Sequence, residues 1–254
     1  MINERRLVDL FLKYVQIDSE SRKEENFREV LEQDLRELGM DVTADEAGNL
    51  FFALDGDEKA EPLLFTAHMD TVVPGQSIRP VMENGVIKSG GDTVLGGDDK
   101  SGIAAIVEAI QVMKEEKIPH RRVEVLFTVE EEIGLNGSRA ADLGQVRSRY
   151  SIAMDGCGPM DEIVVNGAGQ ANVEIEITGV AAHAGNSPEK GVSAVIAAAD
   201  AVSAMKLLKV DEETTANIGT VTANSPANIV CSHIRMLGEV RSRNPRKLED
   251  QLEH

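Results

Sequence analysis

Tryptophan is absent from the 254-residue sequence, and aromatic residues make up only 3% of it. The 42% hydrophobic content can still form a core, which must consist mainly of Ala, Val, Ile, Leu and Met side chains. A chain of this length can form one large domain or two modest ones.

Basic residues are also scarce, with 26 Lys and Arg against 44 Asp and Glu and a formal net charge of -18. Such a chain repels polyphosphates and anionic membrane surfaces unless a local basic patch overrides the charge. No run of Lys or Arg forms such a patch. The sequence therefore predicts neither a nucleic-acid partner nor a membrane partner.

Long hydrophobic runs and cysteine pairs are missing as well. No segment approaches the ~20 apolar residues of a membrane span, and the first 17 residues carry charges throughout, unlike a signal peptide. Cys157 and Cys231 are too few and too far apart for a disulfide framework, which favours a reducing compartment. We therefore expect a cytoplasmic protein.

The first two thirds of the sequence alternates strand and helix patterns. Apolar residues recur at helical spacing over 4–17, 24–38 and 101–116. Short runs rich in β-forming residues, suited to strands buried on both faces, occupy 49–54, 62–69, 123–129 and 150–154. This order predicts an α/β fold in which helices cover a central sheet.

The pattern changes after about residue 167. Residues 171–179 alternate apolar and polar side chains, as in a strand with one face in water. The strand is followed by an Ala-rich helix, two further strands and the start of another helix, at 192–208, 217–223, 229–242 and 247–254. This order resembles an incomplete ferredoxin-like α+β unit. We expect domains at 1–167 and 168–254, with the hinge at 166–170.

Metal-binding residue types cluster where the predicted strands end. His68 and Asp70 follow one strand, Asp98 and Asp99 precede a helix, and Asp155 follows the last strand of the first domain. A run of glutamates, Glu130, Glu131 and Glu132, follows another strand. Open α/β sheets place their sites at such strand ends. Converging carboxylates repel one another unless a cation neutralises them. One imidazole with several carboxylates suits Zn²⁺, Co²⁺ or Mn²⁺ better than Ca²⁺.

Each of these features alone has an ordinary explanation. An isolated His-x-Asp is usually incidental, a run of glutamates is usually a solvated face, and paired aspartates before a helix are often an N-cap. The prediction of a metal site rests on all of these features occurring together at the strand ends. A nucleotide-binding loop is excluded at GGDDKSG, because it lacks the Gly-Lys-Ser/Thr ending and places carboxylates where a phosphate would bind. No Gly-x-Ser-x-Gly nucleophile motif is present.

Four segments, AHMDTV, GGDDKSG, FTVEEEIG and AMDG, in this order and at these separations, resemble the M20 family of metallopeptidases, and most closely its peptidase T-like branch. The resemblance implies a zinc-exopeptidase-like mixed sheet flanked by helices, with a smaller lid and dimerisation domain. It also implies a homodimer that releases N-terminal residues from short peptides.

The resemblance implies a ligand set for two zinc ions per subunit, with Co²⁺ or Mn²⁺ as alternatives. Asp98 would bridge the ions, His68 and Asp155 would bind one of them, and Glu132 would bind the other. The peptide bond between Asp98 and Asp99 would be cis.

Further roles follow from the same resemblance. Asp70 would orient the His68 ring, and Glu131 would be the general base. In the second domain, His183 of AHAG would steady the oxyanion in a neighbouring subunit's site. Asn228 and Arg241 would bind the substrate backbone and terminal carboxylate.

One departure and several alternatives accompany this interpretation. Family members continue well beyond this length and supply a last histidine ligand, so we expect the chain to be a fragment. An N-acyl-amino-acid deacylase or carboxypeptidase-like M20 enzyme would use the same metal ligands, and an inactive metal-binding fragment is a more distant alternative. The intact Glu131 favours an enzyme.

Overall fold

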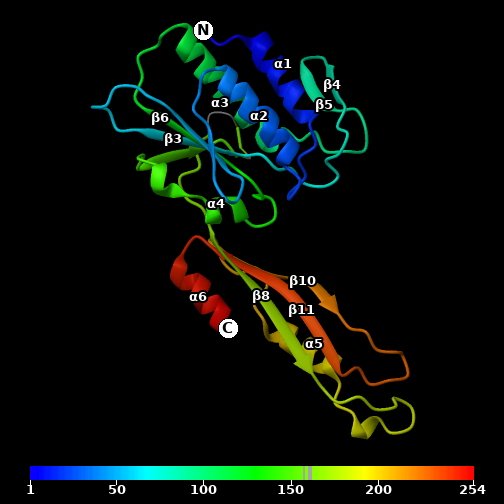
Figure 1. The fold of residues 1–254 in the computed structure, drawn as a ribbon. Coiled ribbons are helices and arrows are strands. Elements are labelled where there is room, and N and C mark those ends of the chain that lie inside the picture. Colours follow the sequence, from blue (N-terminus) through cyan, green and yellow to red (C-terminus); the bar gives the residue numbers. More distant parts are fainter. Residues whose placement is uncertain (157, 160–161) are drawn as a thin grey trace. The chain divides into compact units, whose positions relative to one another are not determined.

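The computed structural model describes residues 1–156, 158–159 and 162–254 (Figure 1). The chain divides into two compact units, residues 1–159 and 160–254. The domain boundary expected at residue 167 stays a prediction. Within the described residues, no helix is both long enough and apolar enough to cross a membrane.

The first unit is built on a five-stranded mixed sheet of order β1-β2-β6-β3-β7. The strands are β1 Thr43–Ala44, β2 Leu50–Leu54, β3 Leu63–His68, β6 Val123–Thr128 and β7 Tyr150–Ala153. Strands β6, β3 and β7 run parallel, whereas β1 and β2 are antiparallel to their neighbours. The predicted α/β class with a mixed sheet is confirmed. The three parallel strands end at one edge, where their following loops can meet.

Three helices cover one face of this sheet, namely α1 Glu4–Val15, α2 Glu25–Glu37 and α3 Gly97–Glu115 (Figure 1). Leu50 and Phe52 of β2 point to this face and pack in the main core, whereas the intervening Phe51 packs on the other face against Ala141 and Val146. This alternation follows from the two-residue period of a strand. The short helix α4, Asn136–Ala140, and the hairpin β4 Pro80–Glu83 and β5 Val86–Ser89 complete the unit.

Helix α1 is fixed to α3 by charge as well as by packing. The side chain of Asn3 caps α1 by accepting a hydrogen bond from the Arg6 amide. The Arg6 guanidinium pairs with the buried carboxylate of Glu108, at 2.6 Å, and with Glu115 on the same helix, at 2.8 Å. These pairs hold the start of α1 against the middle and the last turn of α3.

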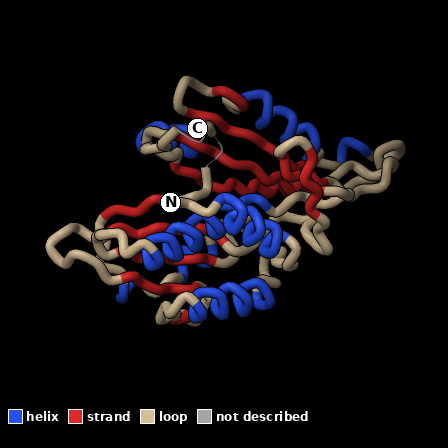
Figure 2. The backbone as a smooth tube through the Cα atoms, turned by 90° about the horizontal axis from the view of Figure 1, so that it is seen from above, coloured by secondary structure: helices blue, strands red, loops and turns tan. Residues whose placement is uncertain are grey.

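The second unit is a four-stranded antiparallel sheet of order β8-β11-β10-β9. Its elements are β8 Gly169–Thr178, α5 Ala194–Ala204, β9 Leu208–Lys209, β10 Thr214–Thr222, β11 His233–Ser242 and α6 Pro245–Glu253. The inward residues of β8 and β11, including Ile175 and Met236, pack against Ala194 and Ala198 of α5. Within each unit the helices run alongside the strands (Figure 2).

Candidate metal centre

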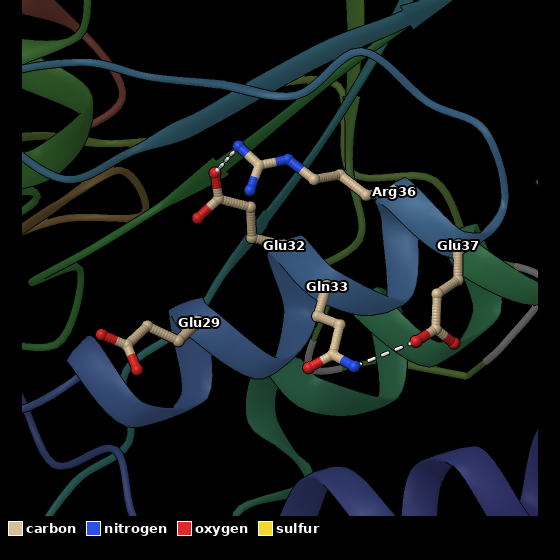
Figure 3. Close-up of a pocket in the computed structure, with 5 residues that line it drawn as sticks. All are labelled: Glu29, Glu32, Gln33, Arg36 and Glu37. Carbon is tan, nitrogen blue, oxygen red and sulfur yellow. Dashed lines mark hydrogen bonds and ion pairs between the residues drawn. The ribbon is translucent and has the colours of Figure 1, made fainter.

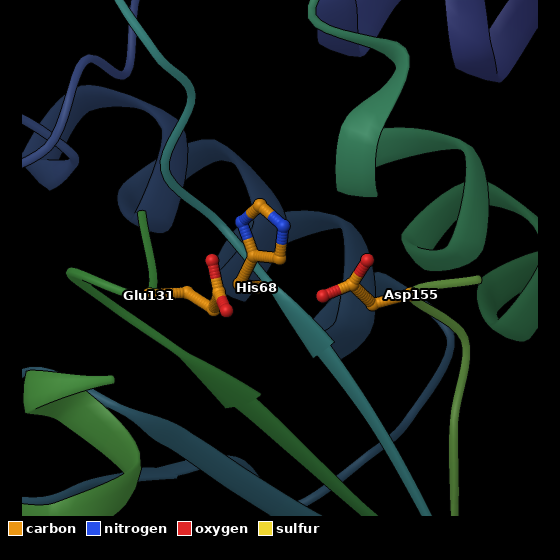
Figure 4. A group of neighbouring side chains, drawn as sticks. All are labelled: His68, Glu131 and Asp155. Carbon is orange, nitrogen blue, oxygen red and sulfur yellow. The ribbon is translucent and has the colours of Figure 1, made fainter. Parts of the chain in front are cut away.

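Four segments of the first unit bring metal-binding side chains to the carboxyl edge of the parallel strands. His68 is the last residue of β3, Asp98 lies in the first turn of α3, and the other side chains follow β6 and β7. Ligand atoms of His68, Asp98 and Glu132 lie within 4.8 Å of one another, as do those of His68, Glu131 and Asp155. The Glu131 and Asp155 carboxylates lie on opposite sides of the His68 ring (Figure 4). The structure thus brings together side chains that the sequence grouped.

The His68 ring is held by Asp70. Its Nδ1 atom lies 2.9 Å from the Asp70 backbone carbonyl and 3.4 Å from the Asp70 carboxylate. A carbonyl oxygen can only accept, so Nδ1 carries a proton and Nε2 is the nitrogen that faces the cluster. Nε2 lies 3.1 Å from Asp98 Oδ1. Both side chains are buried, with exposed fractions of 2% for His68 and 0% for Asp70.

The two aspartates at the start of α3 have different surroundings. The peptide bond between Asp98 and Asp99 is cis, as the resemblance implied. The Asp98 side chain is largely exposed, whereas Asp99 is buried. Among the described residues, Asp99 Oδ2 has no hydrogen-bond partner.

The cluster shifts the pKa of several of its members. Burial raises the pKa of Asp99 to about 7, and the nearby Asp155 and Asp98 charges act in the same direction. Burial likewise raises the pKa of Glu131 and Glu132, opposed by His68 and supported by neighbouring carboxylates.

The pKa of His68 is also raised, but by the neighbouring carboxylates and not by burial. Burial alone would lower the pKa of the ring, but the carboxylates of Asp70 and Asp98 outweigh burial and raise it to about 10. The His68 imidazole therefore partly offsets the repulsion among the carboxylates around it.

The donor set fits a divalent cation. It offers one imidazole nitrogen and several carboxylate oxygens at mutual distances that a single ion or a close pair can span. A cation would neutralise the carboxylates, whose raised pKa values record their mutual repulsion and burial. The side-chain chemistry of this edge is that of a metal centre.

The three residues proposed for the second domain all have exposed side chains. His183 and Asn228 lie on adjacent segments, because the Ala184 amide donates to the Asn228 carbonyl at 2.9 Å. His183 Nδ1 accepts from the Gly185 and Asn186 amides, each at 3.1 Å, so a neutral ring carries its proton on Nε2 and can donate outward.

Arg241 is separated from this pair within the second unit. It lies near the end of β11, whereas the segment with Asn228 precedes the strand's first residue, His233. At about 3.3 Å per residue, Arg241 is roughly 26 Å along the strand from His233. The Arg241 guanidinium pairs with Glu239 at 2.9 and 3.0 Å. The structure therefore does not join Arg241 to the other two.

A separate hollow on α2 has the features of an ordinary helix surface (Figure 3). Its polar side chains pair with one another at a spacing of four residues, Arg36 with Glu32 at 2.5 Å and Gln33 with Glu37 at 2.9 Å. Such pairs stabilise exposed helices. The hollow is therefore not a candidate site.

Sequence reasoning missed several residues that support the metal centre. Ser21 donates to Asp70 Oδ2 at 2.7 Å, and Glu24 accepts from the Glu130 amide at 3.0 Å. Asn49 accepts from the Val129 amide at 3.1 Å. No sequence signal marks these side chains, because their partners are far away in the chain.

Two family models match the chain. Peptidase family M28 matches residues 49–203, and the peptidase dimerisation domain of M20 enzymes matches residues 167–254. The first match spans β3, α3, β6 and β7, the elements that carry the metal centre.

Individual relatives are similar over nearly the whole chain. A tripeptidase structure from Staphylococcus aureus has a TM-score of 0.97 and 40% identity, covering 100% of this chain and 70% of that one. The aminopeptidase PepT structure from Bacillus cereus has a TM-score of 0.92 and 43% identity, covering 99% and 70%. Peptidase T of Lysinibacillus sphaericus is 28% identical over 83% of this chain. The chain spans 62% of that peptidase T and 70% of each of the two solved structures.

Proposed function

Because the chain belongs to the M20 family of metallopeptidases, in its peptidase T-like branch, we propose that it hydrolyses short peptides and releases their N-terminal residues. The observation that carries the proposal is the meeting of His68, Asp98, Glu131, Glu132 and Asp155 at one sheet edge. The solved relatives at 40% and 43% identity are described as a tripeptidase and an aminopeptidase, which favours peptides over acyl-amino acids.

Four side chains would hold two zinc ions. His68 and Asp155 would bind one ion, Glu132 the other, and Asp98 would bridge them. When bound, such a pair of ions lowers the pKa of a water molecule and polarises the scissile carbonyl. Co²⁺ and Mn²⁺ suit the same nitrogen and oxygen donors.

Glu131 would act as the general base. Its carboxylate lies beside the His68 ring, and burial raises its pKa, so it is a better proton acceptor than a solvated glutamate. Glu131 would take the proton of the attacking water and deliver it to the leaving amine. Asp70 would keep the His68 ring oriented throughout.

The second unit would serve as lid and dimerisation domain. The M20 dimerisation match over residues 167–254 supports a homodimer through this unit. His183 Nε2–H would donate to the developing oxyanion in a neighbouring subunit's site, and Asn228 would bind the substrate backbone. Arg241 would bind the terminal carboxylate. The scarcity of cysteine supports a cytoplasmic location for the enzyme.

A substrate panel tests the proposal. Dipeptides, tripeptides and N-acyl-amino acids are incubated with the purified chain and Zn²⁺, Co²⁺ or Mn²⁺, and the released products are identified. Release of the N-terminal residue from tripeptides is expected. Faster cleavage of acyl-amino acids would support the deacylase alternative, and metal binding without any hydrolysis would support the inactive alternative.

A further inference from the structure

The turn between α1 and α2, residues 17–24, touches every segment that carries the proposed metal centre except the one after β7. We call these residues the N-terminal turn. Its backbone and Glu24 make the following contacts: Lys100 Nζ to the Ile17 carbonyl at 2.6 Å, the Thr71 amide to the Ser19 carbonyl at 2.9 Å, the Ser21 amide to the Thr71 carbonyl at 3.3 Å, and the Glu130 amide to Glu24 Oε1 at 3.0 Å. One short segment thus supports the loop after β3, the start of α3 and the loop after β6.

Ser21 reaches the centre of this arrangement through its side chain. Its hydroxyl donates to Asp70 Oδ2 at 2.7 Å. The same carboxylate accepts from the Glu131 amide at 2.9 Å and the Glu132 amide at 3.1 Å, and it lies 3.4 Å from His68 Nδ1. A single buried carboxylate therefore links the N-terminal turn to His68 and to both glutamates.

We propose that Ser21 is a positioning residue for the metal centre, acting through the Asp70 carboxylate. Hydrogen bonds to an ionised carboxylate are stronger than neutral ones and fix its orientation. With Ser21 donating, the plane of the Asp70 carboxylate is set so that it can accept both glutamate amides at once. The proposal rests on the proposed function for its catalytic consequence, but the fixed geometry exists in the chain itself.

Ser19 provides a matched control in the same turn. It is fully buried, yet its hydroxyl has no hydrogen-bond partner among the described residues. Its backbone carbonyl, which binds Thr71, is unchanged by Ser19→Ala. Ser19→Ala and Ser21→Ala therefore remove the same atom from the same turn, and only the second removes a contact with Asp70.

Hydrogen exchange of the metal-free chain tests the positioning role without reference to activity. Ser21→Ala is expected to raise the exchange rate of the Glu131 and Glu132 amides by about tenfold, since losing a bond to a charged group has this order of effect. Ser19→Ala should leave these rates unchanged, and Ser21→Thr should restore them. Equal rates in Ser21→Ala and the parent would overturn the proposal.

Metal titration and steady-state kinetics measure the effect of Ser21 on the metal centre. Ser21→Ala should weaken Zn²⁺ binding about tenfold and lower kcat, because it disturbs Asp70, the outer partner of the proposed ligand His68. Ser19→Ala should match the parent in both. If the parent cleaved no peptide, the proposed function would fail while the exchange rates still decided the role of Ser21.

Discussion

Glu131 and Glu132 are neighbours in sequence with different proposed tasks, and both carboxylates lie beside His68. Replacing each by glutamine keeps its size and removes its charge. Glu131→Gln should lower kcat by about 10²–10⁴-fold with metal affinity nearly unchanged, because a general base contributes a factor of this order. Glu132→Gln should instead weaken metal binding. Calorimetric metal titration beside peptide turnover separates the two, and loss of metal in Glu131→Gln would make Glu131 a ligand.

Glu124 of β6 gives a prediction about pH. Burial would raise its pKa, but hydrogen bonds from Arg122 and from the Ser148 hydroxyl and amide outweigh burial and hold the pKa below its ordinary value of 4.5. Because the pKa is lower in the folded state, the charge stabilises the native chain above pH 4.5, and this contribution is lost as pH falls through the folded-state pKa.

Glu124→Gln should therefore lower the free energy of unfolding by about 2 kcal/mol at pH 7, with the difference from the parent shrinking below pH 4.5. Urea unfolding at pH 7 and at a pH below 4.5 measures this difference in the free energy of unfolding. Glu29→Gln, on the exposed face of α2, is the control and should change stability by less than about 0.5 kcal/mol. A difference that stays constant with pH would contradict the account.

At the scale of single residues, the sequence predicted the groups of the metal centre better than their support. His68 and Asp155 follow recognisable apolar runs, so their place at the sheet edge could be predicted. Ser21, Asn49 and the unpartnered oxygen of Asp99 could not, because their roles depend on segments that meet only after folding.

At the scale of elements, the loop after β6 depends on a close approach at Gly137. A Cβ atom there would lie 2.1 Å from the Val129 carbonyl oxygen and 2.7 Å from Asn49 Oδ1. Asn49 itself bridges Val129 and Gly137 through hydrogen bonds of 3.1 and 2.9 Å. The glycine thus lets α4 fold back onto the strand end that precedes Glu131.

Gly137→Ala should destabilise the chain by about 1–3 kcal/mol, because backbone atoms cannot move aside as a flexible side chain can. Displacement of the loop should also weaken metal binding. Thermal unfolding and metal titration measure the two effects. Gly91→Ala is the control, since an added Cβ there would meet only the Arg79 guanidinium, at 3.7 Å. If Gly137→Ala kept the stability and metal affinity of the parent, the contact between Gly137 and the Val129 carbonyl would be looser than the structure shows.

The elements themselves were largely predictable. The apolar runs at 49–54, 62–69 and 123–129 became β2, β3 and β6, and the helical spacing at 4–17 became α1. The hairpin of β4 and β5 was not predicted, because none of its side chains is buried and they give no hydrophobic pattern. The antiparallel direction of β2 was also hidden, since buried runs look alike in either direction.

At the scale of the whole molecule, each unit has its own core. The larger core packs α1, α2 and α3 on the mixed sheet, and the smaller one packs α5 on β8 and β11. A change of pattern along the sequence could predict two such parts, because an alternating strand exposes one face and a buried parallel strand does not.

Because each unit has its own core, the effect of metal on the stability of each unit tests whether the metal centre lies in the first unit. All proposed ligands lie in the first unit, on segments that are distant in sequence. A ligand that binds only the folded state stabilises it by about 2.7 kcal/mol at a concentration of 100 times its Kd. For a unit of this size, that corresponds to a rise of about 5–10 °C in its melting temperature.

Zn²⁺ should therefore raise the unfolding transition of residues 1–159 and leave that of residues 160–254 unchanged, as followed by calorimetry with and without a chelator. Hydrogen exchange should locate the effect, with slower exchange in 63–70, 97–103 and 129–137 and no change in 169–178. His68→Ala should abolish the shift, because it removes the only imidazole of the cluster as the structure describes it. A Zn²⁺ shift that survived in His68→Ala, or that appeared in β8, would place the binding site elsewhere in the chain.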